Sequence, residues 1–202
     1  MRRYGFLAVG LGLGLALAGL AFVWFRSTQP PAELHGLLLQ DNLPAADFTL
    51  TAEAGRRVSL SDFRGRVVLL YFGYTFCPDV CPATLAEVKQ AFKVLGAQAE
   101  ELQLLMISVD PERDTPEKLA DYVARFDPRF LGVTGTEAEI ASATVPFGVI
   151  YQKHAGSAAT GYLIDHTASL TVIDRQGYTR MIFPFGVTGE DLAADLRYLL
   201  SR

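Results

Sequence analysis

The two cysteines of this 202-residue chain stand four positions apart, in the segment Cys77-Pro78-Asp79-Val80-Cys81-Pro82. The apolar run from Val67 to Phe72 predicts a buried strand before them, and Pro82 to Leu95 predicts a helix after them. Both sulfurs are therefore expected at a strand-to-helix junction, where free N–H groups and the helix dipole favour thiolate over thiol. Two neighbouring thiolates either exchange electrons or hold a soft metal ion.

A purely structural disulfide is the alternative interpretation, since extracytoplasmic chains often contain one. In the chain-entropy model, closing a five-residue loop contributes only about 2 kcal/mol. A soluble part of about 175 residues can also form an adequate core without such a cross-link. Neither consideration explains why the cysteines accompany two prolines at this junction, so redox or metal chemistry is favoured.

A membrane anchor is predicted over residues 1–26. Gly5 to Phe25 is uncharged and almost wholly apolar, and a helix of its length reaches about 31 Å, enough to cross a bilayer core. Two arginines precede this run and one follows it, which favours a cytoplasmic N-terminus. A cleaved signal peptide is the alternative, because Ala16-Leu17-Ala18 has the small-x-small form, but the apolar run continues beyond it.

The rest of the chain is then expected on the periplasmic side of a bacterial cytoplasmic membrane. Residues 27–42, which include Pro30-Pro31, predict a linker, and residues 43–202 predict one domain. Removing the three arginines of the anchor from the 18 basic residues leaves 15 against 22 acidic residues, a formal charge of −7. No basic stripe is present, which excludes nucleic-acid binding as the function.

The pattern of strands and helices predicts the fold class. Strands are predicted at 48–51, 58–60, 67–72, 102–109, 130–133, 161–164, 170–174 and 178–183, and helices at 82–95, 115–126, 137–143 and 189–200. Thr115 and Thr188 are the predicted N-caps of two of these helices. A strand, a cysteine pair at a helix start, β-α-β and then β-β-α is the order of an α/β, thioredoxin-like fold.

Three histidines are candidates for a third ligand beside the cysteines. His35, in an extended lead-in, and His154, in a polar stretch of small residues expected to be an exposed loop, are interpreted as structural or solvated. His166 differs because Asp165-His166-Thr167 immediately precedes the predicted strand at 170–174. In a thioredoxin-like layout the loop before that strand lies against the cysteine turn, so an imidazole nitrogen can join the two sulfurs.

Three segments together resemble the Sco/SenC family of membrane-tethered copper proteins, which assist assembly of cytochrome c oxidase. They are Gly73-Tyr74-Thr75-Phe76-Cys77-Pro78-Asp79-Val80-Cys81-Pro82, Ser108-Val109-Asp110-Pro111-Glu112-Arg113-Asp114-Thr115-Pro116 and Tyr162-Leu163-Ile164-Asp165-His166. The resemblance extends from about Leu43 to the C-terminus. It implies copper ligands at Cys77, Cys81 and His166, and it implies the copper-centre subunit of the oxidase as a partner. Other copper chaperones or thiol reductants are further partners that it allows.

The chemistry of these residue types agrees with copper. Cu(I) prefers thiolate ligands and accepts imidazole as a third donor, and the same set can serve Cu(II). Zn²⁺ in structural sites commonly has a fourth ligand, and no further cysteine or obvious histidine is available. Met106 and Met181 lie in apolar stretches and are interpreted as core residues. Asp110, Arg113 and Asp114 are expected to organise the loop after the strand at 102–109.

Two functions are expected for such a site, and they overlap. The first is a copper metallochaperone that supplies the binuclear copper centre of cytochrome c oxidase. The second is a thiol–disulfide oxidoreductase that uses Cys77 and Cys81 as its redox pair, which leaves open whether the protein is an enzyme. General oxidoreductases of this fold usually have Cys-x-x-Cys and a proline before the strand at 170–174, where this chain has His166-Thr167. A peroxidase-like function lacks a convincing motif.

Overall fold

The computed structural model describes residues 34–39, 43–157 and 161–201. The predicted anchor at residues 1–26 and most of the predicted linker at 27–42 lie outside the described residues. Within the described ranges, no helix is both long enough and apolar enough to cross a membrane.

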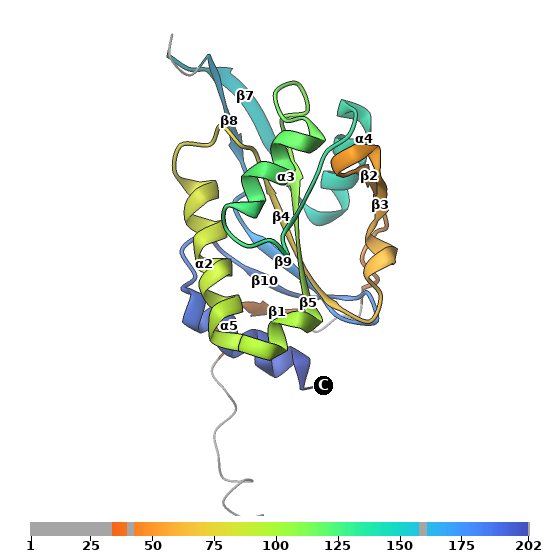
Figure 1. The fold of residues 1–202 in the computed structure, drawn as a ribbon, viewed down its shortest axis with the longest axis vertical. Helices are drawn as coiled ribbons and strands as arrows, with labels where there is room; N and C mark the ends of the chain where they lie inside the picture. Colours follow the sequence, from red (N-terminus) through yellow and green to blue (C-terminus); the bar gives the residue numbers. More distant parts are fainter. Residues whose placement is uncertain (1–33, 40–42, 158–160, 202) are drawn as a thin grey trace, which may run out of the picture. The chain divides into compact units, whose positions relative to one another are not determined.

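A six-stranded sheet forms the centre of the domain, in the order β1-β10-β9-β4-β5-β6 (Figure 1). Its strands are β1 (Leu37–Leu38), β4 (Val67–Gly73), β5 (Leu102–Ser108), β6 (Leu131–Val133), β9 (Leu170–Ile173) and β10 (Thr179–Phe183). The strands β4, β5 and β6 are parallel, whereas β9 is antiparallel to β4, β10 to β9, and β1 to β10. Every residue of β4 and β5 is buried, which explains their almost continuous apolar sequences.

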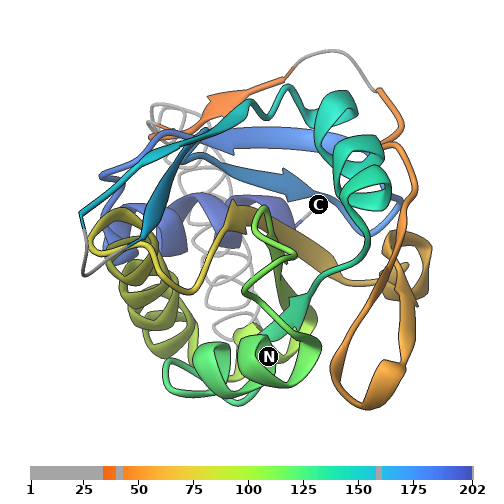
Figure 2. The same cartoon turned by 90° about the horizontal axis from the view of Figure 1, so that it is seen from above.

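Among the described residues, four α-helices pack around this sheet: α2 (Val80–Leu95), α3 (Pro116–Ala124), α4 (Glu137–Thr144) and α5 (Gly189–Leu200). The helices α2 and α5 pack against each other on one face of the sheet, while α4 and the hairpin of β2 (Thr49–Thr51) and β3 (Arg57–Ser59) lie toward the other face (Figure 2). Short 3₁₀ segments occur at Glu53–Gly55, Leu60–Phe63, Gly96–Glu101 and Val145–Phe147. The predicted N-caps Thr115 and Thr188 are confirmed, because each side chain accepts a backbone N–H of the first helical turn.

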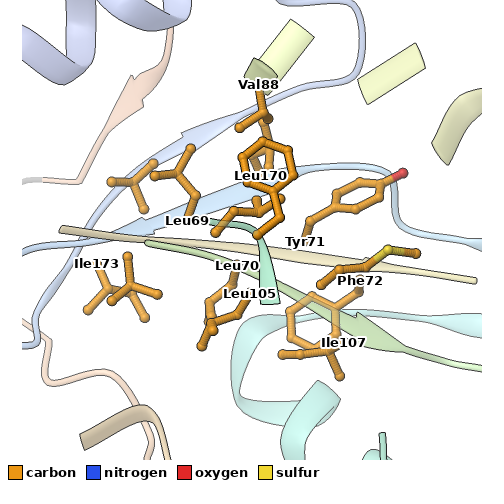
Figure 3. Packing of buried hydrophobic residues seen from close by; sticks show 14 of the residues in the cluster. Leu69, Leu70, Tyr71, Phe72, Val88, Leu105, Ile107, Leu170 and Ile173 are labelled. Carbon is orange, nitrogen blue, oxygen red and sulfur yellow. The ribbon is translucent and has the colours of Figure 1, made fainter. Parts of the chain in front are cut away.

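The core lies on both faces of β4, because alternate side chains of a strand point in opposite directions. Figure 3 shows Leu69 and Tyr71 on the side of Val88, which belongs to α2, and Phe72 on the opposite side. On that opposite side the Phe147 ring lies 5.9 Å from the Phe72 ring, centroid to centroid. The sheet is thus buried between two apolar layers, as the predicted α/β class requires.

Two segments differ from the predicted elements. The stretch expected as an exposed loop around His154 is the strand β7 (Tyr151–Ala155), which pairs with β8 (Tyr162–His166) in a separate two-stranded sheet. The strand β1 pairs with β10, so the folded domain begins before residue 43, where the prediction placed its start. Neither strand has a strong local pattern, because β1 forms by pairing with the distant β10, and β7 forms by pairing with β8, the next strand along the chain.

Candidate metal centre

The cysteines lie at the junction of β4 and α2, as predicted. The helix begins at Val80, two residues earlier than expected, so Cys81 belongs to its first turn and is completely buried. Cys77 precedes the helix and is half-buried. Its sulfur accepts a hydrogen bond from the backbone N–H of Cys81, with N and Sγ 3.4 Å apart. Both cysteines are free thiols in this structure.

Gly73 provides the space that Cys81 occupies. A Cβ atom at position 73 would lie 2.8 Å from the Cys81 sulfur and 2.9 Å from Cε1 of Tyr71. Both distances are well below ordinary van der Waals contact. A side chain at this position would therefore displace the buried sulfur, so the glycine that ends β4 is a requirement of the site.

His166 approaches the cysteines from the end of β8. Its Nε2 atom lies 3.4 Å from the Cys81 sulfur, and its Nδ1 atom lies 3.2 Å from the carbonyl oxygen of Thr167. Because a carbonyl oxygen only accepts hydrogen bonds, this contact assigns the ring proton to Nδ1. The lone pair of Nε2 then faces the sulfurs, which is the tautomer that a metal ligand needs.

Cys77, Cys81 and His166 thus form one cluster, in which the two sulfurs and an imidazole nitrogen all lie within 4.8 Å of one another. Among the described residues, this is the only group of three or more His, Cys, Asp or Glu side chains arranged in this way. Two sulfurs and one imidazole nitrogen are a soft donor set, which fits Cu(I). Three protein ligands also leave room for a further ligand on the ion.

The surroundings of the two thiols shift their pKa values in opposite directions. The hydrogen bond from the Cys81 thiol, with further ones from the backbone N–H groups of Cys81 and Asp79, lowers the pKa of Cys77 to about 4, although burial opposes this shift. The same contact with Cys77 and deep burial raise the pKa of Cys81 far above its usual range. Cys77 is therefore the thiolate of the metal-free site, and Cys81 keeps its proton.

A cleft of about 290 Å³ gives access to the cluster. Cys77, Asp79, His154 and His166 all line it, whereas Cys81 lies behind them. Asp79 acts on Cys77 through its backbone N–H and not through its exposed carboxylate. A ligand from a partner protein can reach a metal ion at the cluster through this cleft.

The loop after β5 holds the cysteine turn in place through hydrogen bonds. The buried carboxylate of Asp114 accepts hydrogen bonds from the backbone N–H and the hydroxyl of Thr75 and from the hydroxyl of Ser108. The prediction that Asp114 organises this loop is confirmed. The same carboxylate also fixes the residue that lies two positions before Cys77, which the sequence alone did not reveal.

Arg113 connects the same loop with the β7–β8 hairpin. Its guanidinium carbon lies 3.6 Å from the centre of the Tyr162 ring and 4.7 Å from that of Phe76. It donates hydrogen bonds to the carbonyl oxygen of Tyr162 and to the buried carboxylate of Asp110. Tyr74 adds a second connection, because its hydroxyl accepts the backbone N–H of Ile164. These contacts place the strand that carries His166 next to the cysteine turn.

The other candidate residues lie elsewhere. His35 packs against Asp191 and Asp195 of α5, which agrees with its structural interpretation. Met106 and Met181 are fully buried, as expected of core residues. Four further residues surround the cluster: Tyr71, Gly73, Tyr74 and Tyr162. The sequence analysis did not identify them as part of the site. Their position near Cys77 in the sequence was the available signal for the first three.

Asp165 precedes His166 in β8 but does not orient its imidazole. Its carboxylate is exposed and accepts a hydrogen bond from Nε2 of His154, with the two atoms 3.0 Å apart. Adjacent residues of a strand point to opposite faces, so Asp165 points away from the cysteines when His166 points toward them. The carbonyl oxygen of Thr167 orients the imidazole instead.

The mixed α/β fold with a cysteine pair at its first strand-to-helix junction places the chain in the thioredoxin-like class. The family model SCO1/SenC matches residues 39–201, and the chain belongs to that family. The bovine "Protein SCO2 homolog, mitochondrial" is 37% identical over 171 residues, which cover 84% of this chain and 64% of that protein. "SCO2-like protein RC0895" of Rickettsia conorii is 31% identical, covering 85% of this chain and 82% of its own length.

Solved structures agree with this assignment. The apo Sco1 protein of Thermus thermophilus superposes with a TM-score of 0.75 and 38% identity, covering 84% of this chain and 99% of that one. Bradyrhizobium japonicum ScoI, solved with copper bound, has a TM-score of 0.70 and 37% identity, covering 77% of this chain and 99% of that one. Both similarities extend over nearly the whole of the compared chains.

Proposed function

We propose that this protein is a membrane-tethered copper metallochaperone that assists assembly of the binuclear copper centre of cytochrome c oxidase. The observation that carries the proposal is the cluster of Cys77, Cys81 and His166, whose ligand atoms lie within 4.8 Å of one another. The copper-bound structure of the related Bradyrhizobium japonicum protein supports copper as the metal. The copper-centre subunit of the oxidase is the proposed recipient.

The ligand set explains how copper is both held and released. Binding requires deprotonated sulfurs, so the Cys81 thiol loses its proton to solvent when its sulfur bonds to copper. Cu(I) is stable with two thiolates and one imidazole, whereas Zn²⁺ in structural sites commonly has four ligands. The open position faces the cleft that Cys77 and His166 line. A thiolate or imidazole of the recipient can bind there before the original ligands dissociate.

Titration of the full-length, reduced protein in detergent micelles with Cu(I) tests this proposal, with X-ray absorption as the readout. One copper per chain is expected, with two sulfur neighbours and one nitrogen neighbour. Cys77→Ala is the matched variant, because Cys77 is half-buried whereas the other cysteine, Cys81, is completely buried in the core. A protein that binds no copper when reduced, or a Cys77→Ala variant with full affinity, contradicts the proposal.

A thiol–disulfide oxidoreductase is the second candidate function, because a half-buried Cys77 of lowered pKa stands beside a buried Cys81. The Cys77 thiolate would attack a disulfide of the target and form a mixed disulfide. The Cys81 sulfur, on losing its proton, would then attack the Cys77 sulfur and release the target. The target gains two electrons and two protons, and the Cys77–Cys81 pair becomes a disulfide.

Cells that lack the protein distinguish the two functions. If it delivers copper, added copper restores oxidase activity in part, and the His166→Ala variant complements poorly. If it reduces the cysteines of the recipient, a small thiol restores activity and His166→Ala complements fully. Rescue by thiol alone, with a functional His166→Ala variant, would assign the enzyme.

The membrane tether and location are part of the proposal. The supporting observation is the uncharged, apolar run from Gly5 to Phe25, followed by the proline-containing segment 27–42. The folded domain is then held on the periplasmic side of the cytoplasmic membrane. A reporter enzyme that is active only outside the cytoplasm, fused after Arg202, is expected to be active. Recovery of the whole protein in the soluble fraction would instead support a cleaved signal peptide.

A further inference from the structure

The hydroxyl group of Tyr71 is buried without a hydrogen-bond partner among the described residues. Tyr71 is the fifth residue of β4, and its side chain is completely shielded from solvent. Figure 3 shows its ring on the α2 side of the sheet, together with Leu69. A buried O–H without a partner destabilises a fold, and a phenylalanine would fill the same apolar space without that penalty. The metal-free fold therefore does not account for the hydroxyl.

The position of Tyr71 points to the metal cluster. The same hypothetical Cβ atom at Gly73 that would touch the Cys81 sulfur would also touch Cε1 of Tyr71, so the ring and the sulfur flank one small space. The Tyr71 ring also meets the imidazole of His166 edge to face, with centroids 6.3 Å apart. Tyr71 is thus next to two of the three proposed ligands. The hydroxyl already acts on the Cys81 sulfur in the metal-free protein, because their contact lowers the pKa of that thiol against the larger effects of Cys77 and burial, although it does not have the geometry of a formed hydrogen bond.

The state of the Cys81 sulfur decides whether this hydroxyl has an acceptor. A thiol sulfur is a weak acceptor, whereas a thiolate sulfur carries negative charge and accepts stronger, charge-assisted hydrogen bonds. Formation of the copper–sulfur bond breaks the S–H bond of Cys81 and sends its proton to solvent. No electron is transferred in this step. Copper binding thus turns a weak acceptor into a strong one, beside a donor that forms no well-aligned hydrogen bond in the metal-free protein.

We propose that Tyr71 is a positioning residue that donates a hydrogen bond to the Cys81 sulfur in the copper-loaded protein and thereby stabilises the loaded state. The inference rests on the proposed function, since it takes copper as the bound ion. It predicts that the hydroxyl has opposite effects on the two states. Its removal leaves the metal-free fold as stable or more stable, and it weakens copper binding. A residue with a merely structural role would affect both states in the same direction.

Tyr71→Phe tests this inference, with Tyr122→Phe as the matched control. The Tyr122 hydroxyl is also buried without a partner among the described residues, but it lies in α3, and its ring packs against Phe126 rather than a proposed ligand. Both variants and the wild type are prepared as full-length, reduced protein in micelles. Three quantities are measured: the metal-free Tm, the Cu(I) affinity against a chromophoric chelator, and the thiolate-to-Cu(II) charge-transfer band.

In both variants the metal-free Tm is expected to be unchanged or higher. Only Tyr71→Phe is expected to lose Cu(I) affinity, by about tenfold, the lower end of the usual effect of removing a hydrogen bond to a metal ligand. Its charge-transfer band is expected at lower energy, because a thiolate without the hydrogen bond gives up its electrons more easily. A lower metal-free Tm, an unchanged Cu(I) affinity or an unmoved band in Tyr71→Phe overturns the inference. A wild-type protein that binds no copper overturns the proposed function and this inference together, so the two failures are distinguishable.

Discussion

The two sides of the metal cluster are built differently. The cysteine side consists of β4, which is buried along its whole length, and the first turn of α2, where Cys81 has no exposed surface. The histidine side is the β7–β8 hairpin, whose two strands pair with each other and not with the central sheet. Every residue of β7 is exposed or partly exposed, and Ile164 is the only buried residue of β8. Figure 1 shows this hairpin extending from the end of the domain.

The difference lies in how many contacts would have to break before a ligand moves. Displacing Cys81 requires repacking of the core, because its sulfur is enclosed near Tyr71 and Gly73. Displacing His166 requires only the release of the hairpin, which Arg113 and Tyr74 connect to the rest of the domain. Regions with few buried contacts open at lower free-energy cost. We infer that the thiolates are pre-positioned for copper and that the imidazole is the adjustable ligand.

Removal of the buried thiolate is the largest expected effect. Cys81→Ala should reduce Cu(I) affinity by more than about 100-fold. Loss of a direct ligand should cost more than replacing a residue that only hydrogen-bonds to a ligand, which typically costs about 10–100-fold. The measurement is competition with a chromophoric Cu(I) chelator. Cys77→Ala should give a loss of the same order. Full affinity in either variant would contradict the idea that the cysteine side holds the ion.

The imidazole is expected to matter less for Cu(I) than for Cu(II). His166→Ala leaves two thiolates, which suffice for Cu(I), whereas Cu(II) favours additional nitrogen ligands. The expected result is a Cu(I) affinity reduced by about tenfold, similar to the effect of replacing a residue that hydrogen-bonds to a metal ligand. The stable Cu(II) form is expected to be lost. Electron paramagnetic resonance of the Cu(II) form provides the second readout. Equal losses for both oxidation states would show that the histidine side is as essential as the cysteine side.

The cysteine side was the more predictable of the two from the sequence. Its signals are local: an apolar run for β4, a proline in the first turn of α2, and two cysteines between them. The N-caps Thr115 and Thr188 and the bounds of α5 were predicted for the same reason. Their stabilising contacts lie within three or four residues along the chain, where a sequence pattern can express them.

The histidine side was predictable only in part. The proximity of His166 to the cysteines followed from the order of the elements, because a thioredoxin-like sheet places that segment beside the cysteine turn. The strand β7 was not predicted, since its polar residues Lys153 and His154 have no local strand pattern and depend on pairing with β8. The contacts of Arg113 and Tyr74 with the hairpin join residues 49 and 90 positions apart, which one sequence alone does not reveal.

The attachment of the hairpin provides a test with a smaller effect. Arg113→Lys keeps a positive charge beside the buried Asp110 but loses the planar group that stacks on Tyr162. Stacking of this kind contributes about 0.5–2 kcal/mol, which corresponds to an opening equilibrium about 2–30 times larger. Hydrogen exchange should therefore become faster at the backbone amides of β8 and stay unchanged at those of β4.

Arg129→Lys is the matched control for that experiment. Arg129 also combines an ion pair, with Asp127, and a stacked aromatic ring, Phe92, but it lies away from the hairpin. Arg129→Lys should make hydrogen exchange faster at backbone amides near Asp127 and Phe92 and leave the exchange rates of β8 unchanged. Faster exchange throughout the domain in Arg113→Lys would show that the hairpin opens only when the whole fold opens.

The pH dependence of the thiols is a further test, because it separates the coupling within the cysteine side from the smaller effect of the histidine side. With the pKa of Cys77 lowered to about 4 and that of Cys81 raised, the folded, metal-free protein holds one thiolate between about pH 4 and the ordinary thiol value of 9.0. The unfolded chain holds two protonated thiols over that range and so binds more protons. The contribution of the pair to stability should therefore grow from about pH 4 to about pH 9 and decline above it, where unfolding releases the one proton that Cys81 still holds in the folded state.

Alkylation of the reduced, metal-free protein measures the lower boundary. The rate at which iodoacetamide modifies Cys77 should rise with pH along a curve whose midpoint is at about pH 4, far below the ordinary thiol value of 9.0. The buried Cys81 should remain unmodified in the folded state. The midpoint belongs to the coupled pair of thiols rather than to Cys77 alone. His166→Ala should shift it upward by a small amount, because the His166 side chain is a lesser cause of the lowered pKa of Cys77 than the hydrogen bond from Cys81. If His166→Ala shifts the midpoint as far as Cys81→Ala does, the imidazole is held against the thiolate as firmly as the buried sulfur, and the hairpin is not the adjustable side of the site.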